Sequence, residues 1–164
     1  MKIAIIYSTL ISDTKESAKI LSKLINADVQ LISIKNAKDT CLLKYNLIIL
    51  GASTFNGKVQ GLFKIYLSRN IKTLLEKPIA LYVNGDENSD MYYNLNKVFT
   101  REIIESSLIS SNFGYEINED IGSFKKRIML KKILKKNEKL PKLNTEEIRN
   151  YSNFINELID KRVG

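Results

Sequence analysis

The chain has 164 residues, with 26 Lys and Arg against 18 Asp and Glu, so its net charge is +8. It contains no His and a single Cys. A Ser-His-Asp or Cys-His mechanism and a His-ligated metal centre are therefore excluded. An internal disulfide is excluded as well, which favours a reducing cytoplasm. The length fits one compact domain over residues 1–164, and we expect neither a transmembrane span nor a signal peptide.

Taken in chain order, the apolar residues alternate between short continuous runs and helical spacing. The pattern predicts strands at about 2–7, 29–34, 46–50, 79–83 and 109–117, and helices at about 13–25, 59–75, 93–106 and 148–159. This alternation indicates a parallel sheet with helices on both faces. Five strands favour a three-layer α/β sandwich with strand order 2-1-3-4-5. Residues 124–140 break the rhythm and predict a basic helical insertion, at about 121–142, after the fifth strand.

A hydroxyl-rich loop follows the first predicted strand and leads into the first predicted helix. It contains Ser8, Thr9, Ser12 and Thr14. These hydroxyls can bind a phosphate together with the free backbone N–H groups of a helix N-terminus. The same residue types are also the preferred caps of an ordinary helix, and this loop alone leaves both readings open.

Aromatic residues stand in the loops after the third and fourth predicted strands. The third strand is followed by Phe55, which can stack on a flat ring or fold back onto the core, and then by Asn56-Gly57, a turn-forming pair. The loop after the fourth strand is long and ends in Tyr92 and Tyr93. Because parallel strands end at the same edge of a sheet, all three loops should border one site. A flat cofactor that carries a phosphate would suit it.

These loops resemble those of flavodoxins. Ser8-Thr9-x-x-Ser12-x-Thr14 is similar to the FMN-phosphate loop, and Gly51-x-Ser53-Thr54-Phe55 and Gly85-Asp86 with Tyr92 are similar to the two loops whose aromatics cover the flavin ring. The resemblance implies a flavodoxin-like fold and FMN as cofactor, with no metal and no assigned catalytic residue. The implied cofactor-binding residues are Ser8, Thr9, Leu10, Ile11, Ser12, Asp13, Thr14, Ser53, Thr54, Phe55, Asn56, Gly57, Asn84, Gly85, Asp86 and Tyr92.

Two residues of the first loop depart from the flavodoxin pattern. Ser12 stands where Gly is usual, and a positive φ there would cost a non-Gly residue about 1–2 kcal/mol. Asp13 puts a carboxylate beside the expected phosphate, which is repulsive unless the side chain points away. Lys15 would partly compensate for that charge.

Three details resemble the menaquinone-dependent protoporphyrinogen dehydrogenase branch of the flavodoxin superfamily. They are the seven-residue first loop, the Gly51-Ala52-Ser53 start of the second, and the position of the basic insertion. This likeness implies an FMN-dependent oxidoreductase that passes electrons from a porphyrinogen-like substrate to a quinone, at the inner face of the cell membrane. The alternatives are a soluble flavodoxin-type electron carrier and a docking module with weak or no FMN binding.

The positive charge is concentrated in the insertion. Between Lys125 and Lys139, eight basic residues stand against one Glu, so this segment carries +7 of the total +8. As a helix it would carry an apolar stripe on one side and a lysine-rich face on the other, a pattern typical of contact with an anionic membrane or an acidic partner. Simple solvation of the lysines is the alternative. Nucleic acid is not expected, because no aromatics are interleaved with the basic residues and no recognition motif is present. The oligomeric state is not predicted.

Two further features are expected to be structural. Cys41 precedes two leucines and predicts a small buried hydrophobe rather than a nucleophile. Asp86, Glu87 and Asp90 lack the spacing of a calcium loop and predict a solvated loop.

Overall fold

The computed structural model describes residues 1–9, 13–38, 40–54, 61–116, 131, 135 and 142–163. Strands and helices alternate along these residues. The elements, with η for a 3-10 helix, are β1 (Lys2–Ser8), α1 (Asp13–Leu24), β2 (Asp28–Ser33), η1 (Ile34–Asn36), η2 (Leu42–Lys44), β3 (Leu47–Ser53), α2 (Gly61–Glu76), β4 (Ile79–Asn84), α3 (Met91–Val98), α4 (Arg101–Glu105), β5 (Ser107–Asn112) and α6 (Thr145–Val163).

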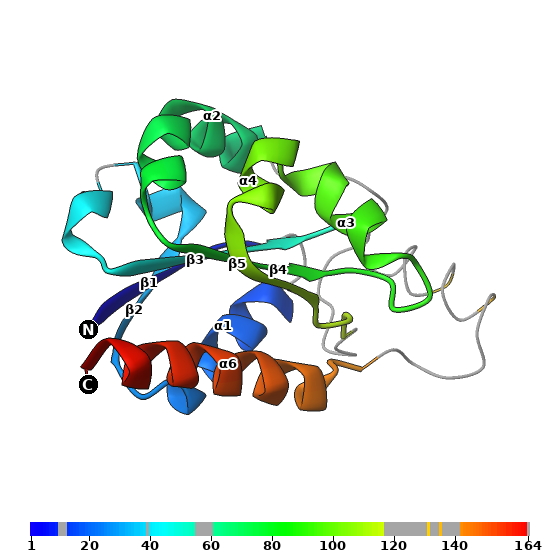
Figure 1. The fold of residues 1–164 in the computed structure, drawn as a ribbon. Helices are drawn as coiled ribbons and strands as arrows, with labels where there is room; N and C mark the ends of the chain where they lie inside the picture. Colours follow the sequence, from blue (N-terminus) through cyan, green and yellow to red (C-terminus); the bar gives the residue numbers. More distant parts are fainter. Residues whose placement is uncertain are drawn as a thin grey trace.

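The strands form one parallel sheet in the order β2-β1-β3-β4-β5 (Figure 1), which confirms the predicted fold and strand order. The central strands β3 and β4 are buried along their whole length, and β1 is buried from its second residue onward. Burial on both faces explains their nearly continuous apolar sequences. The edge strands β2 and β5 are partly exposed, which explains their weaker patterns.

Helices cover both faces of the sheet. Helices α1 and α6 lie on one face, and α2, α3 and α4 lie on the other (Figure 1). The α1/α6 face buries Leu21 and Ile155 against Ile5 of the sheet. The opposite face buries Phe63 and Leu74 of α2 in a separate apolar cluster. The sheet therefore divides two cores, and its carboxyl-terminal edge is the end at which β1, β3 and β4 open into loops.

The prediction of one helix over residues 93–106 is wrong. The chain forms two helices there, and Phe99 between them has an extended backbone, with φ −107° and ψ 151°. This break turns the Phe99 ring into the core, where it meets Phe63 edge-on at a centroid distance of 5.9 Å. Burial of the aromatic ring therefore outweighs continuation of the helix.

The prediction that Cys41 is buried is also wrong, because its side chain is exposed. Cys41 has an extended backbone (φ −71°, ψ 104°) directly before η2, and the next residue, Leu42, is buried instead. Neighbouring side chains on extended backbone point to opposite sides, so only one of the two can face the core.

The predicted insertion at about 121–142 lies almost entirely outside the described residues, where only Lys131, Lys135 and Lys142 of that range are placed, all exposed. None of the helices in the described part of the chain is long and apolar enough to cross a membrane.

Candidate functional site

The first predicted loop joins the end of β1 to the start of α1. Ser8 ends β1 and is buried, and α1 begins with Asp13 and Thr14, which are 3% and 0% exposed. Leu10, Ile11 and Ser12 lie outside the described residues. The first turn of this 12-residue helix follows the carboxyl end of β1, and N–H groups in the first turn of a helix have no intrahelical partner.

Asp13 is a buried carboxylic acid in the first turn of α1. Its Oδ1 accepts a hydrogen bond of 2.8 Å from the Thr14 N–H, whereas its Oδ2 is buried and has no hydrogen-bond partner among the described residues. Burial raises the pKa of Asp13 from 3.8 to about 6, against the opposing effect of the Thr14 hydrogen bonds, and the charge of Glu116 adds to the rise. Close to pH 6 this group is therefore half protonated.

The ends of β3 and β4 supply two more polar side chains beside α1. Ser53 and Asn84 are register partners on these strands, and both are buried. The Asn84 Nδ2 donates to Ser17 Oγ of α1 and to the Gly114 carbonyl, each at 2.9 Å. The Asn84 Oδ1 and the Ser53 Oγ have no hydrogen-bond partner in the part of the chain that the structure describes.

Ser53 lies on the same face of the sheet as Asn84. Their neighbours Ala52 and Val83 point into the α2 core, and side chains alternate along a strand. Asp13, Ser53 and Asn84 thus bring three unsatisfied buried oxygens to the α1 side of the carboxyl edge. Buried polar groups are normally hydrogen-bonded, so such a cluster indicates a place for water or a ligand.

The loop after β4 is fixed by side chains that the sequence analysis missed. The Asp86 carbonyl accepts hydrogen bonds of 3.2 Å from the Nδ2 atoms of Asn94 and Asn112. The Asn112 Oδ1 in turn accepts the Gly85 N–H at 3.1 Å. A Cβ on Gly85 would lie 2.3 Å from Thr54 Oγ1, so any larger residue there would force the buried Thr54 side chain to move. The backbone at residues 84–86 is therefore held in one position.

The aromatic residues predicted beside the ring are only partly described. Tyr92 is the second residue of α3 and is 59% exposed, next to the equally exposed Tyr93, whose ring centroid lies 3.7 Å from the Lys97 Nζ. Phe55, Asn56 and Gly57 lie outside the described residues. A third aromatic was missed: Tyr115, after β5, whose pKa is raised by partial burial and by the Asp86 charge. The strand predicted at 109–117 includes Tyr115, but β5 ends at Asn112, so Tyr115 belongs to the loop that follows.

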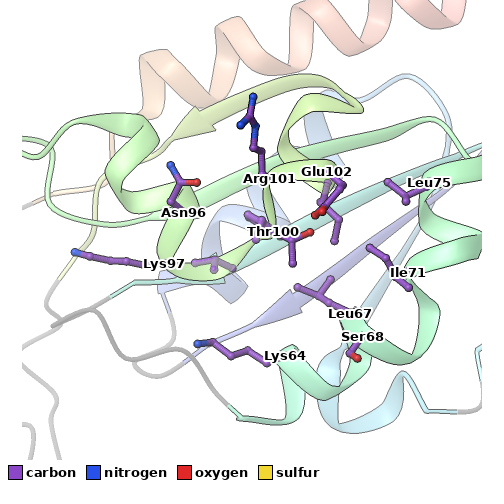
Figure 2. A pocket seen from close by; sticks show the side chains of 13 residues that line it. Lys64, Leu67, Ser68, Ile71, Leu75, Asn96, Lys97, Thr100, Arg101 and Glu102 are labelled. Carbon is purple, nitrogen blue, oxygen red and sulfur yellow. The ribbon is translucent and has the colours of Figure 1, made fainter.

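Two further features were considered as sites, a group of metal-ligating side chains and a surface hollow. No group of three or more metal-ligating side chains occurs among the described residues, including Asp86, Glu87 and Asp90. A hollow of about 820 Å³ lies between α2 and the segment 96–103, with an apolar floor and Lys64, Lys97 and Arg101 around it (Figure 2). None of the predicted site residues lines it.

The sheet has the doubly wound α/β topology, and proteins of this class bind ligands at the carboxyl ends of the strands, the edge at which these polar side chains lie. Residues 4–144 match the model of the flavodoxin domain family, and the chain belongs to that family. No curated protein matches it significantly.

Solved flavodoxins share the fold. Oxidised flavodoxin 2 from Bacillus cereus superposes with a TM-score of 0.62 at 18% identity, covering 96% of this chain and 99% of that one. A flavodoxin from the domain Archaea gives 0.58 at 16% identity, covering 98% and 99%. The flavodoxin of Streptococcus pneumoniae TIGR4 gives 0.61 at 12% identity, covering 94% and 97%. The protoporphyrinogen dehydrogenase likeness receives no support from these matches.

Proposed function

We propose that this protein binds FMN at the carboxyl edge of its sheet and transfers electrons through it. The observation that carries the proposal is the cluster of unsatisfied buried oxygens from Asp13, Ser53 and Asn84 beside the N-terminus of α1. The Ser53 hydroxyl can donate to a phosphate or sugar oxygen, and the Asn84 carbonyl oxygen can accept from a sugar hydroxyl. The polar groups present therefore fit the phosphate and ribityl chain, with the exception of a charged Asp13.

The remaining residues would position the cofactor. Ser8, Thr9, Ser12, Thr14 and the N–H groups of α1 would hold the phosphate, Phe55 and Tyr92 the two ring faces, and the backbone at 56–57 and 85–86 the polar edge of the ring. The fixed loop at residues 84–86 suits this task, because a prepositioned backbone loses little freedom on binding. FMN would supply the electron chemistry, and the protein would supply orientation and electrostatics.

Titration of the cofactor-free protein with FMN tests this proposal. Tyr92→Ala should weaken FMN binding by about 2- to 10-fold and reduce the quenching of flavin fluorescence, because a stacked ring contributes about 0.5–1.5 kcal/mol. Tyr93→Ala is the matched control, since the Tyr93 ring contacts the Lys97 Nζ of the same helix and is not among the predicted site residues, so FMN binding should be unchanged. A preparation that stays colourless and ignores added FMN would rule out both redox functions and leave the docking module.

We further propose, on the three sequence details alone, that electrons pass to a quinone from a porphyrinogen-like substrate. The FMN-loaded protein should then couple porphyrinogen oxidation to quinone reduction in a single assay. A plain carrier would accept and return electrons with a redox partner but would catalyse neither half-reaction. That outcome would leave the flavodoxin-type carrier as the function.

The same proposal places the protein in the cytoplasm, on the inner face of the cell membrane, through residues 125–139. Each basic residue near an anionic surface contributes about 1 kcal/mol at most, so binding should fall steeply with salt. Sedimentation with anionic vesicles should recover the full chain but not a variant lacking residues 124–140. Neutral vesicles are the control. Equal recovery of the full chain and the variant would show that residues 124–140 do not bind the membrane. The basic residues would then serve an acidic protein partner or only be solvated.

A further inference from the structure

Asp13 is the one residue of the polar cluster whose charge opposes the proposed ligand. It lies in the first turn of α1, where the family's phosphate loop meets the helix, and it is 3% exposed. One oxygen, Oδ1, is held by the Thr14 N–H at 2.8 Å. The other, Oδ2, has no hydrogen-bond partner among the described residues. A phosphate arriving here would meet an oriented carboxyl group with one oxygen still free.

We propose that FMN binding to this chain takes up one proton from solvent, which is then shared between Asp13 Oδ2 and a phosphate oxygen. This inference rests on the proposed function and adds a protonation requirement to it. An O–H bond forms on either the carboxyl or the phosphate, and the resulting O–H···O⁻ hydrogen bond replaces a repulsion between two anions. Asp13 would thereby make the site select the less charged form of its ligand.

The two groups are matched in acidity, which makes proton sharing favourable. A phosphate monoester loses its second proton near pH 6. Burial raises the pKa of Asp13 to about 6 as well. Because the two groups interact directly, they would titrate as one coupled pair that retains a proton at neutral pH. An ordinary exposed aspartate, with a pKa near 3.9, would be a far weaker partner for that proton.

The surroundings offer no buried cation that could neutralise Asp13 instead, as far as the described residues extend. On α1 itself, Lys15 and Glu16 are both exposed and of opposite charge. On β4, the Tyr82 hydroxyl donates to the Thr14 carbonyl at 3.0 Å, and burial raises the pKa of that phenol far above its ordinary value, so it stays neutral.

Three more titratable groups lie in the described part of these surroundings. After β5, Glu116 is a second carboxylate that acts on Asp13. Tyr7 on β1 and Tyr151 on α6 add to the rise in the pKa of Tyr82 that burial causes. None of these groups carries positive charge and Lys15 is exposed, so among the described residues protonation removes the repulsion between Asp13 and a phosphate more directly than a buried cation does.

Isothermal titration calorimetry in buffers of different ionisation enthalpy measures the proton directly. Close to one proton should be taken up per FMN bound above about pH 7, and the affinity should fall about tenfold per pH unit between about pH 7 and pH 8.5. Riboflavin, which lacks the phosphate, should bind without proton uptake and without this slope.

Asp13→Asn should abolish the proton uptake and bind FMN at least about tenfold more tightly than the wild type near pH 8. Glu16→Gln is the matched control: it removes an exposed carboxylate from the same turn and should keep the slope. FMN binding without proton uptake in the wild type, or equal effects of both substitutions, would overturn the inference. The proposed function, FMN binding, would still stand. No binding of FMN or riboflavin by either the wild type or Asp13→Asn at any pH would overturn the proposed function and this inference together.

Discussion

At the scale of single residues, Asp13 links the stability of the protein to pH even without a ligand. Its pKa is raised from 3.8 in the unfolded chain to about 6 in the fold, chiefly by burial. The folded state therefore binds this proton more tightly than the unfolded state does. The stability that the protonated carboxyl provides is complete below about pH 4 and is lost as the pH rises through about 6.

The Asp13→Asn variant isolates this contribution. Between about pH 4 and pH 7 the wild type should lose up to about 3 kcal/mol of unfolding free energy relative to the variant, because one pKa unit corresponds to about 1.4 kcal/mol. Urea unfolding at several pH values measures the difference. Glu16→Gln should run parallel to the wild type over the same range. A parallel course for Asp13→Asn would contradict a raised pKa at this position.

At the scale of elements, one side chain ties the last helix to the first. The Asn156 Oδ1 on α6 accepts the Asn26 N–H at 2.8 Å, and its Nδ2 donates to the Leu24 carbonyl at 2.9 Å. These are backbone groups at the end of α1, where a helix leaves its carbonyls without intrahelical partners. Asn156 thus acts as a C-terminal cap contributed by a distant part of the sequence.

Asn156→Ala should therefore lower the unfolding free energy by about 1–3 kcal/mol, the range expected when paired backbone groups lose their partner. Asn153→Ala is the matched control on the same helix, because Asn153 is exposed. Hydrogen exchange should also accelerate at the Asn26 amide in the first variant only. Equal stability of the two variants would show that the cap contributes nothing.

The helices and strands also show which parts of the fold could be predicted from the sequence. The strands β1, β3 and β4 were predictable because burial on both faces demands an unbroken apolar run. The break at Phe99 was not, because the ring contact that accompanies it is made with Phe63, 36 positions earlier in the chain. Local spacing there is helical, so the pattern of nearby residues carries no sign of that contact.

The residues of the candidate site also fall into those that the sequence could predict and those that it could not. Its strand-end residues, such as Ser53 and Asn84, could be predicted from where parallel strands stop. Asn94 and Asn112, which fix the loop at Asp86, could not, because their role depends on α3 and β5 meeting that loop in space. The raised pKa of Asp13 likewise depends on burial that no local pattern encodes.

At the scale of the whole molecule, the described structure is held by its cores rather than by charges. The two salt bridges among the described residues, Lys19–Glu16 and Arg101–Glu105, are both exposed. Such pairs contribute about 0–1 kcal/mol each. Because β1, β3 and β4 contribute side chains to both apolar clusters, neither core can unfold without exposing the other face of the same strands.

The two cores should therefore unfold in one transition. Ile155→Ala on α6 and Leu74→Ala on α2 remove fully buried side chains from opposite faces of the sheet (Figure 1). Each should lower the unfolding free energy by about 2–5 kcal/mol with an unchanged urea dependence. Leu75→Ala, at a position 42% exposed, is the control and should cost much less. Far-ultraviolet circular dichroism and tyrosine fluorescence should report the same midpoint in every variant. Separate midpoints in either core variant would show that the helices on one face can unfold while the sheet and the helices on its other face stay folded.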